Sequence, residues 1–272
     1  MILLLASRRD IASVNIAKEM LDHYDFEKTS ENFDENPTYF LKFRNREIKL
    51  IYTKKELIYT QDITEHFQPE LVICISRHSS ASGKPTFSVH TPGNLTEDSS
   101  YGGLARKVSV SPASAMKNAL KEMKKLQEEY NLAYEVCYEC THHGPSLDVP
   151  TMFVELGSSL RQWKDLKAAE AVAHAAMKAA TSEEKYTAVL GVGGPHYNEK
   201  FTRIALESDI AFGHIIPKYA VGLVDLEILK QCVEKTLEKV ETAVLDWKGI
   251  KGADKQPLLD SLKTLGLKIE KV

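Results

Sequence analysis

The stretch "MILLLASRRDIASVNIAKEMLDHY" (residues 1–24) decides the fold class. Residues 2–6 are a short, continuous apolar run, which is typical of a buried strand. After it, apolar side chains recur at a rough helical spacing (Ile11, Val14, Ile16 and Met20), and Ser7 or Asp10 can cap that helix. A buried strand that leads directly into a helix is the opening unit of an α/β sheet.

The rest of the chain alternates in the same way. Residues 38–43 and 48–53 are expected to pair as a hairpin, and residues 70–76 to form a central strand. Further strands are expected at 132–140, 151–156, 186–194, 211–217 and 267–272. Helices are expected at 111–130 (Ser111 as cap, Pro112 first), 163–181 and 225–247, with a linker at 251–257 before a C-terminal helix. We therefore predict one α/β domain over residues 1–272, with a mixed, mostly parallel central sheet flanked by helices.

Composition excludes several classes of protein. The net charge of −3 argues against wholesale polyanion binding, although a local basic patch remains compatible with it. No apolar run approaches the about 18 residues that a membrane-spanning helix needs. We read the N-terminal run as a strand and not as a signal peptide, and four cysteines do not make a disulfide framework. These features predict a cytoplasmic protein.

Six of the nine histidines fall in four similar contexts, at or near predicted strand ends and beside glycine or proline. The four stretches are "SRHSSASGKPTFSVHTPGN" (76–94), "ECTHHGPSLDVPTMFVELGSS" (139–159), "GVGGPHYNEKF" (191–201) and "FGHIIPKY" (212–219). Imidazoles supply proton and metal chemistry near neutral pH. Because sites in open α/β sheets gather at the carboxyl ends of strands, we expect these histidines to share one cleft at a rim of the sheet.

Two motifs within these stretches have ordinary alternatives. Gly193 and Gly194 permit a close approach of a phosphate or an oxyanion to backbone N–H groups, but they also suit a simple strand-to-helix turn. They belong to neither a dinucleotide fingerprint nor a P-loop. Cys137 and Cys140 have the C-x-x-C spacing, but strand residues three apart point to opposite faces, which favours two buried thiols over a metal pair.

The four stretches together resemble the archaeal and plant class of D-aminoacyl-tRNA deacylase, and the likeness covers nearly the whole chain. The resemblance implies hydrolysis of the ester between a D-amino acid and the terminal ribose of tRNA. It further implies two zinc ions per subunit, a monomer, and a fold similar to that of peptidyl-tRNA hydrolase and the phosphorylases. The expected partner is D-aminoacyl-tRNA, with no membrane or DNA.

Residue roles are assigned from the chemistry of the side chains. We expect zinc to be bound by His78, His90, His142 and His143, with Glu155 as a further ligand or catalytic group. His196 and His214 are expected to act as ligand or general base. Substrate binding is assigned to Arg77 and Lys84 for phosphate, to Gly193 and Gly194 for the oxyanion or the terminal adenosine, and to Tyr197.

Three other interpretations stay open at this stage. The histidines could work as acid–base groups without a catalytic metal. The chain could be an RNA-binding module that shows strong salt dependence and no turnover. Analogy of fold alone suggests a nucleoside phosphorylase-like enzyme, which would need a phosphate pocket.

Overall fold

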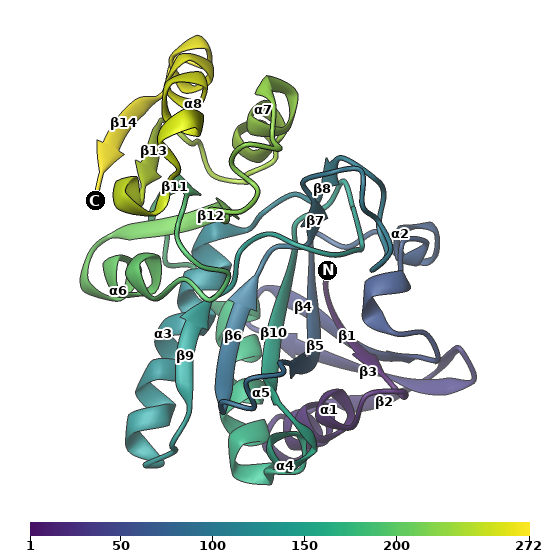
Figure 1. The fold of residues 1–272 in the computed structure, drawn as a ribbon. Coiled ribbons are helices and arrows are strands. Elements are labelled where there is room, and N and C mark those ends of the chain that lie inside the picture. The colour runs from purple at the N-terminus through teal and green to yellow at the C-terminus, as the bar shows by residue number, and fades with distance from the viewer.

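The computed structural model describes residues 1–272, and its largest layer is an eight-stranded mixed sheet (Figure 1). In spatial order the strands are β2 (Glu27–Phe33), β3 (Asn36–Phe43), β4 (Arg46–Thr53), β1 (Ile2–Ser7), β5 (Leu71–Ser79), β10 (Thr151–Ser158), β6 (Thr86–His90) and β9 (Glu135–Tyr138). The central strands β4, β1, β5 and β10 are parallel, β3 is antiparallel to both of its neighbours, and β6 is antiparallel to β10 but parallel to β9. The predicted α/β class with a mixed sheet is confirmed, as is the hairpin of β3 and β4.

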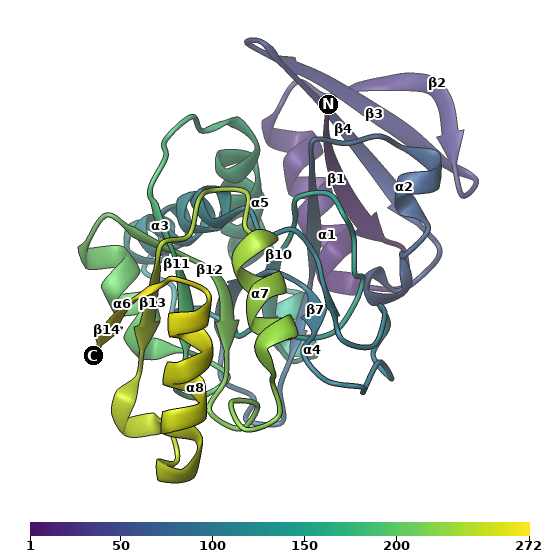
Figure 2. The same ribbon diagram turned by 90° about the horizontal axis from the view of Figure 1, so that it is seen from above.

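A second sheet is built from the C-terminal part of the chain. Its four strands are all parallel and lie in the order β12 (Ile210–Ile216), β11 (Thr187–Val192), β13 (Thr242–Leu245) and β14 (Lys268–Lys271). Seen from above, α7 (Leu226–Glu234) and α8 (Gly252–Thr264) lie on one side of it and α6 (Glu199–Glu207) on the other (Figure 2). We expected one central sheet, but β11 pairs with β12 and β13 and not with the larger sheet.

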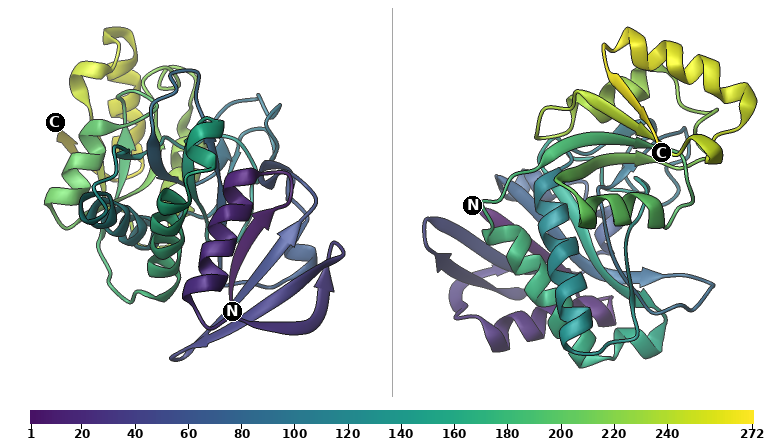
Figure 3. Two further views of the ribbon diagram at one scale, coloured as in Figure 1. Left: turned by 90° about the horizontal axis from the view of Figure 1, so that it is seen from below. Right: turned by 90° about the vertical axis from the view of Figure 1, so that its left-hand side faces the viewer.

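Three helices cover one face of the larger sheet. They are α1 (Ile11–His23), α5 (Leu166–Thr181) and α3 (Ala113–Glu129), which lie side by side (Figure 3). Alternate strand residues such as Leu4, Ile73 and Val154 point into this helical layer and belong to its core of 42 buried residues. Their neighbours Leu5, Cys74 and Phe153 point to the other face, where a core of nine residues includes Leu57 of η1 (Leu57–Tyr59) and Ile63 of α2 (Ile63–His66).

Several predicted helix limits were wrong. The predicted helix 225–247 is three elements, because the chain leaves the helix after Glu234, residues 242–245 pair with β11 as a parallel strand, and η2 (Trp247–Gly249) follows. The predicted linker 251–257 is instead the first half of α8, which accommodates Pro257. The predicted helix 163–181 is interrupted after α4 (Leu160–Trp163), and Asp165 caps α5.

Helix caps also differ from the prediction in one place. Asp10 caps α1 as expected, since its carboxylate accepts from the Ser13 N–H. Ser111 does not cap α3; the carboxylate of Glu238 accepts from the N–H groups of Ala113 and Ser114. That long-range cap could not be read from local sequence.

The short strands β7 (Gly93–Asn94) and β8 (Lys107–Val108) pair with each other outside both sheets. β2, β6 and α6 were not predicted, and β6 matters most because it carries His90. None of the helices has the length and apolar character that crossing a bilayer requires.

The packing of the three helices on the sheet should depend on side chains of the central strand β1. Leu4 of β1 is fully buried against the helical layer, so Leu4→Ala is expected to lower the free energy of unfolding by about 2–5 kcal/mol through lost burial and a residual cavity. Leu223, which is 63% exposed, is the control, and Leu223→Ala should change stability by no more than about 0.5 kcal/mol. Denaturant unfolding of both variants measures the difference, and equal values would contradict the packing described here.

Candidate active site

A cluster of polar side chains lies on the face of the larger sheet opposite the three helices. Strand alternation places Ser76 and His78 of β5, Glu155 of β10, and Ser88 and His90 of β6 on this face. The register confirms the arrangement, because Glu155 lies across from Ser76 on one side and from Ser88 on the other. All five residues are nearly or wholly buried.

This location corrects the expectation of a site at one rim. The strands β5 and β10 run one way, whereas β6 and β9 run the other, so their carboxyl ends lie at opposite edges of the sheet. The segment that follows β9 therefore returns over the sheet face, where Glu139 meets His78 of β5 and His143 packs against Phe153 of β10.

A cavity of about 470 Å³ opens above this cluster, which is within the range of ordinary small-ligand sites. The segment after β9 contributes Glu139, His142 and His143, and the loop after β11 in the second sheet contributes His196 and Tyr197. The remaining lining residues come from β1, α1's cap, η1, β5, β10 and one loop: Ser7, Asp10, Glu56, Leu57, Ile58, Tyr59, Ser76, Arg77, His78, Ser79, Tyr101, Phe153 and Glu155. Both sheets thus contribute to the same cavity.

Imidazole rings are packed against one another at this site. The ring centroids of His90 and His142 are 4.3 Å apart, those of His142 and His143 are 4.2 Å apart, and those of His142 and His196 are 4.5 Å apart. His78 reaches the same group through Glu139, at 3.1 Å from its Nδ1. The structure therefore brings together five of the six histidines that the sequence singled out.

Glu139 is the central acid of the cluster, and no role was predicted for it from the sequence. Glu139 is only 2% exposed. Its carboxylate oxygens lie 3.1 Å from His78 Nδ1, 3.1 Å from His196 Nε2 and 3.8 Å from His142 Nε2. Burial on its own raises the pKa of Glu139, but the interactions with His196 and His78 outweigh it and hold the pKa well below the usual value. The available signal was its position as the first residue of "ECTHH", directly after a strand.

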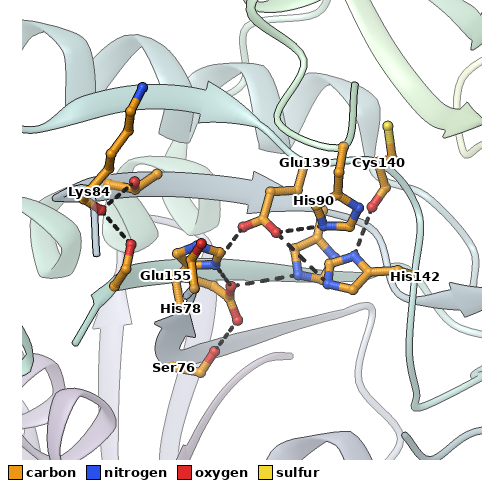
Figure 4. Close-up of polar contacts among 12 residues, drawn as sticks. Ser76, His78, Lys84, His90, Glu139, Cys140, His142 and Glu155 are labelled. Carbon is orange, nitrogen blue, oxygen red and sulfur yellow. Dashed lines mark hydrogen bonds and ion pairs between the residues drawn. The ribbon is translucent and has the colours of Figure 1, made fainter. Parts of the chain in front are cut away.

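Glu155 is the second buried acid, and Figure 4 shows it beside Ser76 and His78. The Ser76 hydroxyl donates to its Oε1 at 2.5 Å, while its Oε2 lies 3.6 Å from His78 Nδ1 and 3.9 Å from His90 Nε2. Burial on its own raises the pKa of Glu155, but the interactions with His78 and His90 lower it by more. The net effect is a pKa below the usual value, so the carboxyl group is ionised. Between the two acids, burial lowers the pKa of His78 but Glu139 and Glu155 raise it above its ordinary value.

The rings of His142 and His143 are each held by a hydrogen bond from Nδ1 to a backbone carbonyl. The Nδ1 of His142 is 2.8 Å from the Cys140 carbonyl, and the Nδ1 of His143 is 2.7 Å from the Gly144 carbonyl. A carbonyl can only accept, so each ring carries its proton on Nδ1 and keeps a lone pair on Nε2. Burial and neighbouring imidazoles lower the pKa of both rings, that of His143 to about 4. Histidines that ligate metals are typically held in this way.

Other ring nitrogens at the site have no partner. The Nε2 of His78 and both nitrogens of His90 are buried without a hydrogen bond. Three overlapping groups of donors have all ligand atoms within 4.8 Å of one another: His90, His142 and His143; Glu139, His142 and His196; and His78, Glu139 and Glu155. Unpaired buried nitrogens, neutral imidazoles and ionised carboxylates make a donor set that fits a metal ion.

Some residues singled out by the sequence lie elsewhere. His214 is fully buried outside the cavity, with Nδ1 at 3.1 Å from the Thr141 hydroxyl and Nε2 at 3.3 Å from the Lys235 carbonyl. Lys84 is exposed and pairs with Glu135 at 3.1 Å. The Gly193 N–H donates to the Ile216 carbonyl, and Gly194 packs near Asn198 and Asp246, so this pair does not face the cavity.

Two other predictions can be compared with the structure directly. Arg77 and Tyr197 do line the cavity, and the guanidinium of Arg77 is 3.2 Å from Glu56. Cys137 and Cys140 are buried free thiols, as predicted, and neither belongs to a candidate metal group. Burial raises the pKa of both.

The fold and the site together define an α/β protein whose cleft is floored by a buried histidine and carboxylate cluster fit for a metal ion. Residues 65–270 match the family model of D-aminoacyl-tRNA deacylase. The D-aminoacyl-tRNA deacylase of Pyrococcus furiosus is 36% identical over 275 residues, with 98% of each chain covered, and that of Methanocaldococcus jannaschii is 35% identical over 285 residues, with 99% of each covered. This chain belongs to the D-aminoacyl-tRNA deacylase family, as its resemblance implied.

A solved structure agrees with the fold over the full length. The crystal structure of a conserved protein of unknown function matches with a TM-score of 0.89 and 31% identity, and the match covers 100% of this chain and 95% of the other. The arrangement of both sheets is therefore shared with a chain of clearly different sequence.

One glycine sets the position of His78. Gly157 lies across from His78 in the register, and a Cβ added to it would meet the His78 carbonyl oxygen and would be 2.5 Å from His78 Cβ and 2.7 Å from its Cδ2. We expect Gly157→Ala to lower the free energy of unfolding by about 1–3 kcal/mol and to weaken metal binding by the cluster, because the backbone and the imidazole of His78 both have to move. Thermal unfolding and metal titration measure the two effects.

The matched control for this substitution is Gly252→Ala. A Cβ at Gly252, at the start of α8, would meet nothing within 4 Å, so metal binding should stay at the wild-type value and the free energy of unfolding should not fall. Wild-type metal binding by Gly157→Ala would show that the cluster does not depend on the position of the His78 ring.

Proposed function

We propose that this chain hydrolyses the ester that joins a D-amino acid to the terminal ribose of tRNA, with zinc bound in the histidine and carboxylate cluster. The substrate class follows from the family, and the cluster supports the chemistry. The observation that carries the proposal is the convergence of His142 and His143, with free Nε2 lone pairs, on the unpaired ring of His90 and the ionised Glu139. Zinc takes imidazole nitrogen and carboxylate oxygen as ligands.

The ligands are assigned from the three donor groups. His90, His142 and His143 form one set, and His78, Glu139 and Glu155 form another, while Glu139 and His142 also belong to the group with His196. Sharing of donors between groups suits two neighbouring ions, the number that the resemblance implies. When bound, zinc would polarise the ester carbonyl and bring the pKa of a water molecule to about 7.

His196 is the proposed general base. Its Nε2 lies 3.1 Å from Glu139 Oε2, so this nitrogen donates to the carboxylate and Nδ1 keeps the lone pair. The hydroxyl of Tyr219 lies 3.2 Å from that Nδ1, and Tyr219 is 58% exposed. The Tyr219 hydroxyl therefore marks a position where a water molecule can hydrogen-bond to the base.

Other side chains are suited to holding the substrate. Arg77 is the one arginine or lysine that lines the cavity, and its partner Glu56 is itself a lining residue, so a phosphate of the terminal nucleotide can replace that carboxylate. Tyr197 packs edge-on against His78 and His196 and fixes their orientation from the cavity side. We leave His214, Lys84, Gly193 and Gly194 out of the proposed site because they lie outside the cavity.

The activity is tested with D-tyrosyl-tRNA and L-tyrosyl-tRNA and the purified protein. We expect the D-ester to be hydrolysed at least about tenfold faster, which corresponds to about 1.4 kcal/mol of discrimination between the two transition states. Release of tyrosine measures both rates. Salt-dependent binding of tRNA without release from either ester would instead identify a non-catalytic RNA-binding protein.

The role of metal is tested by chelation and by substitution. Removal of metal by a strong chelator should abolish hydrolysis, and added Zn²⁺ should restore it. Glu139→Gln and His142→Ala should each lower the rate by about 100-fold or more, since they remove shared ligands. Metal content is measured in the same samples.

His66 supplies the control for these variants, because it is a half-exposed histidine of α2 that pairs with Asp62, and neither residue lines the cavity. His66→Ala should keep the wild-type rate. Full activity after chelation would replace the zinc mechanism with one in which His196 and Glu139 act as acid–base groups without metal.

A further inference from the structure

A second group of histidine and glutamate side chains, the types that can bind a metal ion, lies on the helical layer. The helices α1 and α5 pack side by side (Figure 3). Each carries a glutamate followed four residues later by a histidine: Glu19 and His23 on α1, Glu170 and His174 on α5. Residues four apart share one face of a helix. The two pairs face each other, with the ring centroids of His23 and His174 5.2 Å apart.

We propose that Glu19, His23 and Glu170, with His174 as a fourth ligand, bind a divalent transition-metal ion that bridges α1 and α5. The ligand atoms of the first three lie within 4.8 Å of one another. The Nε2 of His174 lies 3.9 Å from Glu170 Oε1, and its Nδ1 lies 2.7 Å from the Tyr24 hydroxyl. That hydroxyl can accept from Nδ1–H and so leave the lone pair on Nε2 for the ion.

Glu19 is the most buried member of this group, with a side chain that is 11% exposed. Its carboxylate accepts no hydrogen bond from the protein, and the nearest ring nitrogen is His23 Nε2 at 3.5 Å. A bound cation would give this carboxylate a closer charged partner than the protein itself supplies. Two imidazoles with two carboxylates suit Zn²⁺ or Co²⁺ better than Mg²⁺ or Ca²⁺.

Lys167 occupies part of this site in the structure. Its ammonium lies 2.8 Å and 2.9 Å from the two oxygens of Glu170, and the Tyr130 hydroxyl donates to the first of these oxygens. The Lys167 side chain is 50% exposed and can turn into solvent. Exposed ion pairs of this kind are weak, so a divalent ion that gains four ligands displaces the lysine from Glu170.

This group is separate from the cleft. No residue is shared between it and the donor groups of the cleft. Asp10, which caps α1, lines the cavity, while His23 ends the same helix, roughly 20 Å away at 1.5 Å of rise per residue. The proposal therefore concerns a structural ion and does not rest on the proposed function.

The experiment is a titration of the full-length, chelator-stripped protein with Zn²⁺, followed by the number of ions bound and by the melting temperature. We expect His23→Ala/His174→Ala to bind one Zn²⁺ fewer than the wild type and to lose part of the melting-temperature gain that Zn²⁺ produces. Glu19→Gln should weaken the same ion about tenfold or more. His66→Ala is the matched control, because His66 also follows an acid by four residues, Asp62 at 3.9 Å, but faces no second such pair.

Lys167→Met keeps the test decisive if the double variant folds poorly, since this side chain is half exposed. Removal of the competing ammonium should tighten binding of this ion about two- to fivefold, the change that an exposed ion pair represents. An unchanged Zn²⁺ count in the double variant, or unchanged affinity in Lys167→Met, overturns the proposal. A cleft that binds no zinc would leave one ion in the wild type and none in the double variant, so the two sites fail independently.

Discussion

The arrangement of the cleft depends on two buried carboxylates, Glu139 and Glu155, whose negative charges must be compensated by nearby groups. Glu139 and Glu155 are almost inaccessible to solvent, and both are held ionised by the histidines around them. An isolated buried carboxylate would be protonated, so the positions of His78 and His196 are tied to those of the acids. Positive charge at this place comes from a protonated imidazole or from a bound cation, and the same side chains serve both states.

Strand direction explains why these residues meet. A purely parallel sheet would have brought the chain ends to a single rim, whereas the antiparallel entry of β6 beside β10 turns the segment after β9 back over the sheet. The exposed edge of the cluster is then closed by the loop after β11, which belongs to the second sheet. The site is thus a product of the junction between the two sheets, although its floor is one continuous face.

Much of this could be predicted from the sequence, because local patterns carried it. The first strand and helix, the hairpin and the α/β class follow from apolar periodicity, and grouping histidines by context identified five residues that do converge. Glu139 was missed because an acid after a strand is unremarkable until its burial is known. The prediction of a single helix over residues 225–247 was wrong for a related reason. Residues 242–245 continue the helix-forming pattern of the residues before them, and only their pairing with β11 makes them a strand.

His214 shows the opposite error. Its context resembled that of the other histidines, yet the Thr141 hydroxyl and the Lys235 carbonyl take up both of its ring nitrogens inside the protein. Sequence context therefore selected residues near the junction of the sheets without distinguishing those that face the cavity. The direction of a side chain across a twisted sheet is fixed by register, which local patterns do not contain.

The construction of the cleft from both sheets has a consequence for biosynthesis. A chain made from its amino terminus has most of the floor once β10 has emerged, but His196 appears only with the loop that follows β11. Contacts of such large sequence separation form late, since loop closure must come first. Ligand capture by the whole cluster is therefore a signal that the nascent polypeptide has docked its carboxyl-terminal sheet, and a ribosome-tethered fragment that stops short of residue 196 would lack it.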